Sequence, residues 1–245
     1  MIKINGLHKW FGSNHVLNDV NLEIRDGETL VIIGRSGVGK SVLLKLIAGI
    51  LDPDNGQILV DGTDIVTLGA SGLDAFRLRL GMLFQGAALF DSLNVRGNVG
   101  FSLYEHTRLS EPEIRKKVEE KLALVGLRNI QELMPAELSG GMKKRVGLAR
   151  AICNDPKVIL YDEPTTGLDP INSDVINNLI LRMQKKLGVT SIVVTHDMTS
   201  AYKVANRIAM LHEGRIIGTG TVDDIRNTSD ILIRQFITGT ADPET

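Results

Sequence analysis

One glycine-rich segment of the chain reads Gly34-Arg35-Ser36-Gly37-Val38-Gly39-Lys40-Ser41. It follows the apolar run Thr29–Ile33 and precedes the apolar run Val42–Ile50, so we expect a strand before it and a helix after it. Glycines allow successive backbone N–H groups to converge on one anion, and the following helix adds the positive end of its dipole. The segment therefore predicts a phosphate-binding loop, hereafter the phosphate loop.

The polar side chains of the phosphate loop indicate which ligand it holds. Lys40 is expected to supply a point charge to the β- and γ-phosphates, and the Ser41 hydroxyl is expected to ligate Mg²⁺. The predicted ligands are therefore ATP and Mg²⁺, bound by all eight loop residues together with Val42. Arg35 either adds positive charge near the phosphates or is a solvated loop residue.

The composition of the chain sets limits on its class. Of its 245 residues, 43% are hydrophobic and 23% are charged, which is enough for a folded core of one large or two small domains. The formal net charge of −1 gives no support for nucleic-acid binding. Cys153 is the single cysteine, and no apolar run approaches the ~20 residues of a membrane-spanning helix. We expect a soluble, intracellular protein without internal disulfides.

Short strand-like runs alternate with longer helical patterns, which predicts an α/β fold. The first 30 residues and the stretch Gln57–Asp64 differ, because they alternate and carry turn residues, and they predict hairpins of a small antiparallel sheet. The predicted strands are Leu22–Ile24, Thr29–Ile33, Gln57–Val60, Met82–Phe84, Val158–Tyr161, Ser191–Thr195 and Ile208–Leu211.

Helical patterns dominate the middle of the chain. Ser110–Glu113 is a capping box with a proline in the first turn, and it opens a helix with one apolar face that we expect to end at Gly126. Ser173–Leu187 repeats the amphipathic pattern. We predict one domain over residues 1–228, with a helical insert at about 87–153, and a short helical tail over residues 229–245.

The predicted strand Val158–Tyr161 ends in two carboxylates, Asp162 and Glu163. Paired acids at a strand end are also common as solvated turn residues. Together with a phosphate loop, they predict that Asp162 helps to hold Mg²⁺. Glu163, pointing the other way along the pleat, is expected to be the general base that orients the attacking water.

A second candidate anion site lies in the segment Leu138–Met142, which reads LSGGM and is hereafter the signature segment. Ser139 can cap a helix running to Cys153, and Gly140 and Gly141 leave the first N–H groups of that helix accessible. With the phosphate loop, this segment resembles the ATP-binding-cassette (ABC) family, whose signature reads LSGGQ. The resemblance implies a RecA-like P-loop NTPase core with an antiparallel β subdomain and an inserted α-helical subdomain. It also implies that the signature segment faces the nucleotide of a second copy of the chain.

Other positions match the ABC family in order. Phe11 is similar to the aromatic residue that stacks on adenine, with the neighbouring Trp10 as the alternative. Gln85 is similar to the glutamine that touches Mg²⁺ and links the site to the helical insert. Asp169 belongs to a segment that resembles the loop crossing the dimer interface, and His196 resembles the histidine that contacts the γ-phosphate. The resemblance thus implies roles for Glu163, His196, Gln85 and Lys40 in hydrolysis.

One branch of the family is more similar, the ATPases of lipid transporters that carry MCE-domain proteins (Mla type). The similarity rests on Val42, Met142, the stretch Leu83–Phe90, Met134–Glu137 before the signature segment, and Arg234–Phe236. It implies phospholipid movement between the inner membrane and the periplasm or outer membrane. The implied partners are transmembrane permease subunits, an MCE-domain lipid-binding protein and a small accessory subunit, with this chain at the cytoplasmic face of the membrane.

Three alternatives remain open from the sequence. An importer of polar solutes, such as amino acids, would use the same motifs. A cassette ATPase acting on DNA or the ribosome usually has long coiled coils or two cassettes, which this chain lacks. A nucleotide kinase would not need the signature segment. Lys143, Lys144 and Arg145 could add positive charge near phosphate, but we expect Lys143 and Lys144 to lie on a solvated helix face.

Overall fold

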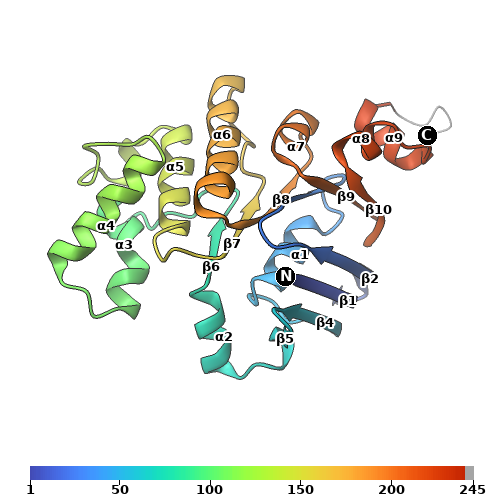
Figure 1. Ribbon diagram of the computed structural model, residues 1–245, viewed down its shortest axis with the longest axis horizontal. Helices are drawn as coiled ribbons and strands as arrows, with labels where there is room; N and C mark the ends of the chain where they lie inside the picture. The colour runs from blue at the N-terminus through green and yellow to red at the C-terminus, as the bar shows by residue number, and fades with distance from the viewer. Residues whose placement is uncertain (241–245) are drawn as a thin grey trace. The chain divides into compact units, whose positions relative to one another are not determined.

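The computed structural model describes residues 1–240 and divides them into two compact units (Figure 1). One unit comprises residues 1–73 and 190–240, and the other comprises residues 74–189. Both contain strands and helices, which confirms the predicted α/β class. Within residues 1–240, none of the helices combines the length and the hydropathy that spanning a bilayer requires. The last five residues of the predicted tail, 241–245, lie outside the described residues.

The first unit begins with an antiparallel sheet of four strands in the order β2-β1-β4-β5. Ile2, Ile4 and Leu7 on β1 are buried, as expected for a strand with one face on a core. The hairpins predicted from the turn residues are therefore confirmed. The strands are β1 (Ile2–Phe11), β2 (Asn14–Ile24), β4 (Asn55–Val60) and β5 (Thr63–Asp64).

The same unit contains a second set of strands, in which β3 pairs in parallel with both β8 and β9, and β10 pairs antiparallel with β9. Every residue of β3 and β8 is buried, which accounts for their continuous apolar runs. The sequence pattern does not predict β10, because Gly218 and Gly220 interrupt its alternation. The elements are β3 (Thr29–Ile33), α1 (Lys40–Ile47), the 3₁₀ helix η1 (Ile65–Thr67), β8 (Thr190–Thr195), α7 (Met198–Val204), β9 (Arg207–His212), β10 (Arg215–Thr221), α8 (Val222–Arg226) and α9 (Ile231–Thr238).

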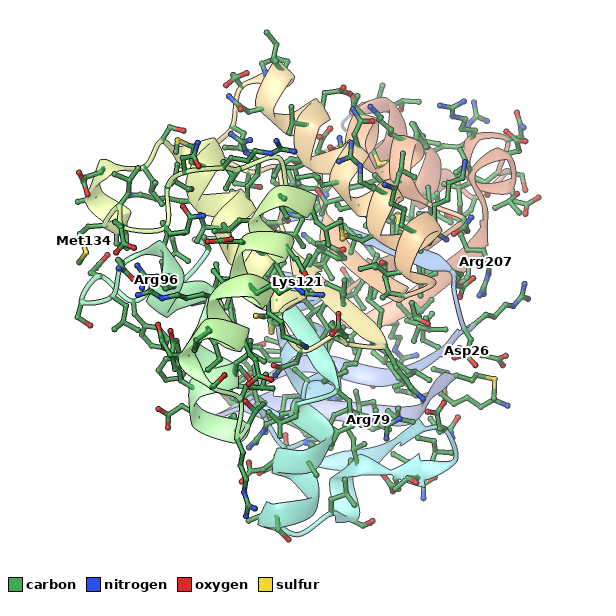
Figure 2. The ribbon with its side chains drawn as sticks, turned by 60° about the vertical axis from the view of Figure 1, so that its left-hand side comes forward. Asp26, Arg79, Arg96, Lys121, Met134 and Arg207 are labelled. Atoms are coloured by element: carbon green, nitrogen blue, oxygen red, sulfur yellow. The ribbon has the colours of Figure 1, made fainter. Side chains whose placement is uncertain are left out.

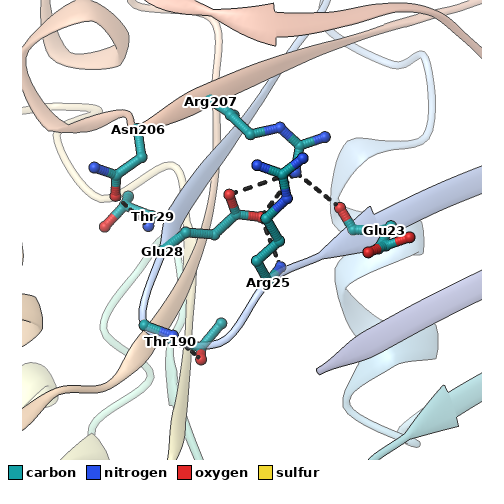
Figure 3. A network of polar contacts seen from close by, with 8 residues as sticks. Glu23, Arg25, Glu28, Thr29, Thr190, Asn206 and Arg207 are labelled. Atoms are coloured by element: carbon teal, nitrogen blue, oxygen red, sulfur yellow. Dashed lines mark hydrogen bonds and ion pairs between the residues drawn. The ribbon is translucent and has the colours of Figure 1, made fainter.

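A polar network joins the start of β3 to its neighbours within this unit (Figure 3). The carboxylate of Glu28 accepts hydrogen bonds from the Arg25 N–H at 2.7 Å and from the Arg207 guanidinium at 3.0 Å. The side-chain oxygen of Asn206 accepts a hydrogen bond from the Thr29 N–H at 2.7 Å. Because a buried carboxylate is stable only when it is paired, this network fixes the turn between β2 and β3.

The second unit has two parallel strands, β6 and β7, with three α-helices and one 3₁₀ helix between them in the chain. The predicted capping box is confirmed, since the Ser110 N–H donates to the Glu113 carboxylate at 2.7 Å. The periodicity did not single out the first of the three helices, Val95–His106. The elements are the end of α2 (Ala70–Arg77), β6 (Leu80–Leu83), α3 (Val95–His106), α4 (Glu111–Leu124), the 3₁₀ helix η2 (Pro135–Glu137), α5 (Gly140–Ala151), β7 (Val158–Asp162) and α6 (Pro170–Leu187).

A buried cation fixes the connection between α5 and β7. Lys121 of α4, labelled in Figure 2, is 7% exposed, and its ammonium group pairs with the carboxylate of Asp155. Cys153, on the same connection, is buried, and burial raises the pKa of its thiol to about 11. The thiol is therefore protonated at neutral pH and behaves as a small apolar side chain.

Candidate functional site

The phosphate loop lies between β3 and α1, so the predicted strand–loop–helix context is confirmed. Two of its glycines are required by the backbone. A Cβ at Gly34 would lie 2.4 Å from the Leu211 carbonyl oxygen, and Gly39 has a φ of +104° and would contact the side chain of Leu17 at 2.9 Å. A larger residue at position 34 would have to displace the backbone at Leu211, and at position 39 it would be strained by the positive φ.

Lys40 is buried at the first position of α1, with 6% exposure. Its ammonium group donates to the carbonyl oxygens of Gly34 at 2.8 Å and Arg35 at 3.0 Å. The lysine therefore spans the loop from the helix back to the end of β3. Arg35, Ser36 and Gly37 are exposed, which leaves this part of the loop accessible to a ligand.

The donors of the phosphate loop fit a nucleotide phosphate with its Mg²⁺. The first N–H groups of an α-helix point away from its body and can bind an anion, and among residues 1–240 no atom outside residues 36–38 lies within 4 Å of the position that a Cβ would take at Gly37. Ser41 lies in the first turn of the same helix. A hydroxyl at this position is an oxygen donor, the type of ligand that Mg²⁺ prefers.

The two candidates for adenine stacking differ in their environment. The Trp10 ring is stacked on His15, with ring centroids 4.0 Å apart, and on His8 at 5.4 Å. Phe11 is 49% exposed, and the Lys9 ammonium lies 5.6 Å from its ring centroid. Trp10 is thus engaged in an aromatic stack, whereas Phe11 has ring surface available for a base, which favours Phe11.

We expect Phe11→Ala to weaken ATP binding by about 5- to 150-fold, because stacking on an aromatic ring contributes about 1–3 kcal/mol per base. Phe11→Tyr is the matched control, since it keeps the ring. Titration with a fluorescent ATP analogue would measure both affinities. If Phe11→Ala binds ATP as tightly as Phe11→Tyr does, Phe11 is not the residue that stacks on adenine.

His196 directly follows β8 and is exposed. The segment after it is held locally, because the Thr195 hydroxyl accepts a hydrogen bond from the Asp197 N–H at 3.0 Å. Asp197 in turn caps α7 by accepting from the Thr199 N–H at 3.0 Å. The histidine is therefore presented to solvent on an ordered strand-to-helix turn.

The acidic pair lies at the end of β7 in the second unit. Asp162 is the last residue of the strand, and Glu163 follows it with a φ of +46°. The prediction that Glu163 continues the pleat is wrong, because the backbone leaves the strand conformation at this residue. Holding a non-glycine residue in this region costs about 1–3 kcal/mol and is typical of functional sites.

Glu163 is buried, with 7% exposure, and its Oε2 accepts a hydrogen bond from the Thr166 hydroxyl at 3.1 Å. Its carbonyl oxygen accepts a hydrogen bond from the Lys144 ammonium at 3.2 Å. The left-handed turn is therefore stabilised through both the backbone and the side chain of this residue. Thr166 lies in the loop after the strand, and no local pattern indicates its bond to Glu163.

The signature segment forms the N-terminus of α5, as predicted. The Ser139 hydroxyl accepts a hydrogen bond from the Met142 N–H at 3.3 Å, and Ser139 and Gly140 are exposed. The helix ends at Ala151, slightly before the predicted end at Cys153. The start of this helix is therefore exposed at Ser139 and Gly140, where an external anion can approach it.

Asp169 caps α6 in the same unit, accepting hydrogen bonds from the N–H groups of Ile171 and Asn172 at 3.0 Å. Hydrogen bonds from Asn172 hold the pKa of Asp169 below its ordinary value. A Cβ at Gly141 would lie 2.8 Å from Oδ1 of Asn172. The signature segment and the start of α6 are therefore closely packed, and a larger residue at position 141 would displace the Asn172 side chain.

The expectation that Lys144 lies on a solvated helix face is wrong. Lys144 is 5% exposed, and its ammonium group donates to the backbone carbonyl oxygen of Gln85. Burial lowers the pKa of Lys144, and the carboxylates of Asp162 and Glu163 oppose that shift. The helical period could have predicted the burial of Lys144, because Gly141, Lys144 and Leu148 lie at helical spacing on the buried face of α5.

Arg150, near the end of α5, holds the segment that follows Gln85. Its two terminal nitrogens donate to the carbonyl oxygens of Ala87 and Ala88, each at 2.7 Å. Both alanines have positive φ, +62° and +48°. Gln85 itself is exposed and lies at the start of this loop. Two cations of α5 hold the loop backbone with its positive φ angles, Lys144 at Gln85 and Arg150 at the two alanines.

Comparison with known proteins agrees with this arrangement. The family model described as ABC transporter matches residues 17–166, which include the phosphate loop, the signature segment and the acidic pair. The chain belongs to the ABC transporter family. The family resemblance and the fold expected from it are thereby confirmed.

Two relatives extend the similarity over almost the whole chain. The probable ribonucleotide transport ATP-binding protein mkl of Mycobacterium bovis is 44% identical over 97% of this chain, which spans only 66% of that protein. The intermembrane phospholipid transport system ATP-binding protein MlaF of Haemophilus influenzae is 43% identical over 99% of this chain and 92% of its own length. The second match confirms the resemblance to the Mla-type branch.

A solved structure of this family is also similar. It is a dimeric, post-hydrolysis state of an ATP-binding cassette bound to ADP and Pi, and it is 33% identical with a TM-score of 0.84. The match covers 91% of this chain and 99% of that cassette. The similarity in fold therefore extends over the phosphate loop, the helical insert and the signature segment.

Proposed function

We propose that this chain is the ATP-hydrolysing subunit of a membrane ABC transporter that moves phospholipid between the inner membrane and the periplasm or outer membrane. The phosphate loop carries the ATPase part of the proposal, because Lys40 is held at the start of α1 and bonded to the loop carbonyl oxygens. The similarity to MlaF over 99% of the chain carries the lipid part. We place the subunit at the cytoplasmic face of the inner membrane as a peripheral component.

The proposed reaction is hydrolysis of ATP to ADP and phosphate between two copies of the chain. The phosphate loop and Ser41 of one copy bind the triphosphate, and Ser139 to Gly141 of the other copy contact the γ-phosphate through the N-terminus of α5. Because the terminal phosphate is shared, ATP favours the closed dimer, and its loss allows the dimer to open. The dimeric cassette bound to ADP and Pi supports this assembly.

In the proposed chemical step, Glu163 accepts a proton from the attacking water as the bond to the γ-phosphorus forms and the bond to the β–γ bridging oxygen breaks. Lys40 and His196 bind the γ-phosphate, and Phe11 stacks on adenine. Asp169 lies in the loop expected to cross the dimer interface. Mg²⁺ bound by Ser41, Asp162 and Gln85 would neutralise the phosphate charge that develops.

An apolar groove in the second unit supports docking of a permease subunit. The groove has a volume of about 630 Å³, and the rings of Phe90 and Phe101 lie in its wall with centroids 4.7 Å apart. The Arg150 guanidinium lies 5.8 Å from the centroid of Phe90. A short amphipathic helix of a permease fits such a surface, since the lining combines apolar and aromatic side chains with Asp74, Arg77 and His106. Movement of the loop after Gln85 would then reach the membrane subunits.

The remaining proposed partners are an MCE-domain lipid-binding protein and a small accessory subunit, which follow from the Mla-type similarity. A polar solute is the second candidate substrate, because the 44% identical mycobacterial relative is named for ribonucleotide transport. The two candidates predict different companions, an MCE-domain protein in one case and a solute-binding protein in the other.

Purification of the tagged chain from detergent-solubilised membranes tests both candidates. We expect to recover a permease and an MCE-domain protein together with bound phospholipid, identified by mass spectrometry. Recovery of a solute-binding protein without lipid would favour the polar-solute importer. Recovery of neither a permease nor any lipid would contradict the transport proposal.

A groove variant tests the docking surface in the same preparation. We expect Phe90→Asp to lower recovery of the permease by about tenfold or more, because a central aromatic anchor contributes about 2 kcal/mol or more to an interface. Leu187→Asp is the matched control, since Leu187 is similarly exposed (39% against 43%) but lies at the end of α6 and does not line the groove. Equal recovery with both variants would exclude the groove as the docking site.

A further inference from the structure

Helix α5 contains residues that act at two different places in the proposed reaction. Its N-terminus, capped by Ser139, would contact the nucleotide of a second copy of the chain. Five residues later, Lys144 lies on the buried face of the helix within the second unit. Since an α-helix rises 1.5 Å per residue, Lys144 lies about 7–8 Å along the helix axis from Ser139. Both residues therefore belong to one continuous hydrogen-bonded helix.

Lys144 donates to two backbone carbonyl oxygens, and each belongs to a proposed functional residue of its own chain. One is that of Gln85, at the start of the loop held by Arg150. The other is that of Glu163, whose backbone is in the left-handed region. A bond to a carbonyl oxygen fixes the peptide plane that follows it, so a single ammonium group sets the backbone at both residues.

We propose that Lys144 is a positioning residue that couples the two nucleotide sites of the dimer: it transmits contact of the signature segment with the partner's nucleotide to Gln85 and Glu163 of its own chain. This inference rests on the proposed function, in which Glu163 is the general base. A lysine suits the task because its compact ammonium group can donate to several acceptors at once. A neutral side chain of similar length would fill the same space without holding either carbonyl oxygen.

The test compares the assembled transporter with wild-type chain and with Lys144→Met, Lys144→Arg and Lys143→Met. Lys143→Met is the matched control, since it removes the same charge from the adjacent, half-buried position of α5. For Lys144→Met we expect kcat to fall about 10- to 100-fold, because small displacements of positioned groups have effects of this size. The Kd for ATP should change by less than about threefold, because the phosphate loop is untouched.

Cooperativity separates positioning from a purely structural effect. For the wild type we expect ATP-dependent turnover with a Hill coefficient above 1, and for Lys144→Met a coefficient close to 1. Lys144→Arg should restore part of kcat and of the cooperativity, because it keeps a buried cation at the same place. Wild-type kcat and Hill coefficient in Lys144→Met would overturn the proposal. A parallel loss of ATP affinity and thermal stability that Lys144→Arg does not restore would overturn it as well.

The variant Glu163→Gln separates failure of this inference from failure of the proposed function. If Glu163→Gln abolishes turnover and Lys144→Met does not alter it, only the coupling role of Lys144 is wrong. If Glu163→Gln retains wild-type turnover, the assignment of the general base is wrong, and the role proposed for Lys144 is wrong with it.

Discussion

Glu163→Gln is expected to lower ATP turnover by about 10²- to 10⁴-fold, the usual contribution of a general base, while ATP binding is retained. Glutamine has the same shape and can still accept the hydrogen bond from the Thr166 hydroxyl, so the buried turn is preserved. It cannot take a proton from water at neutral pH. Bound ATP should therefore accumulate and hold two copies of the chain together.

Two measurements check this prediction. Phosphate release gives the turnover, and size-exclusion chromatography with and without ATP and Mg²⁺ gives the fraction of closed dimer. Glu213→Gln is the control, because Glu213 also has a positive φ (+46°) but its side chain is 86% exposed. Turnover of Glu163→Gln within a few-fold of wild type would contradict the assignment.

Lys40→Ala is expected to weaken ATP binding about 10- to 150-fold and to remove turnover at ordinary ATP concentrations. The estimate follows from the loss of a hydrogen bond to a charged group, about 1.5–3 kcal/mol. Lys40 is also bonded to Gly34 and Arg35, so its removal loosens the phosphate loop itself. Equilibrium binding of radiolabelled ATP would measure the effect.

Lys45→Ala is the matched control for this experiment, because Lys45 lies in the last turn of the same helix and is half-buried. It should bind ATP as the wild type does. ATP affinity that survives in Lys40→Ala would mean that the backbone of the loop alone binds the nucleotide, and that the role given to Lys40 is wrong.

Much of the fold was predictable from local patterns. The apolar runs of β3 and β8 are buried along their whole length, and the phosphate loop has the strand and helix that its glycines imply. Strand β10 and helix α3 were not predicted, since glycines or a weak apolar face leave little periodic signal. Their formation depends on the strands and helices against which they pack.

In the candidate site, too, some features were predictable from local patterns and others depend on packing between distant segments. The chain order of the motifs was sufficient to select Lys40, Ser139 and Glu163, because each belongs to a short pattern with a local physical reason. The pattern could not predict that Glu163 adopts a left-handed backbone or that Lys144 is buried. The two residues are 19 positions apart in the chain and are joined by a hydrogen bond that no local pattern encodes.

The amino-acid sequence by itself determined the class of fold, the phosphate loop and the identity of the acidic and glycine residues that we propose to act on a nucleotide. These are encoded by neighbours in the chain, through strand and helix periods, caps and glycine conformations. Only the tertiary structure decided which charged side chains are buried and which carbonyl oxygens they hold, as for Lys144 and Arg150. The reason is that burial and hydrogen bonding of a long side chain depend on segments that meet only when the chain is folded.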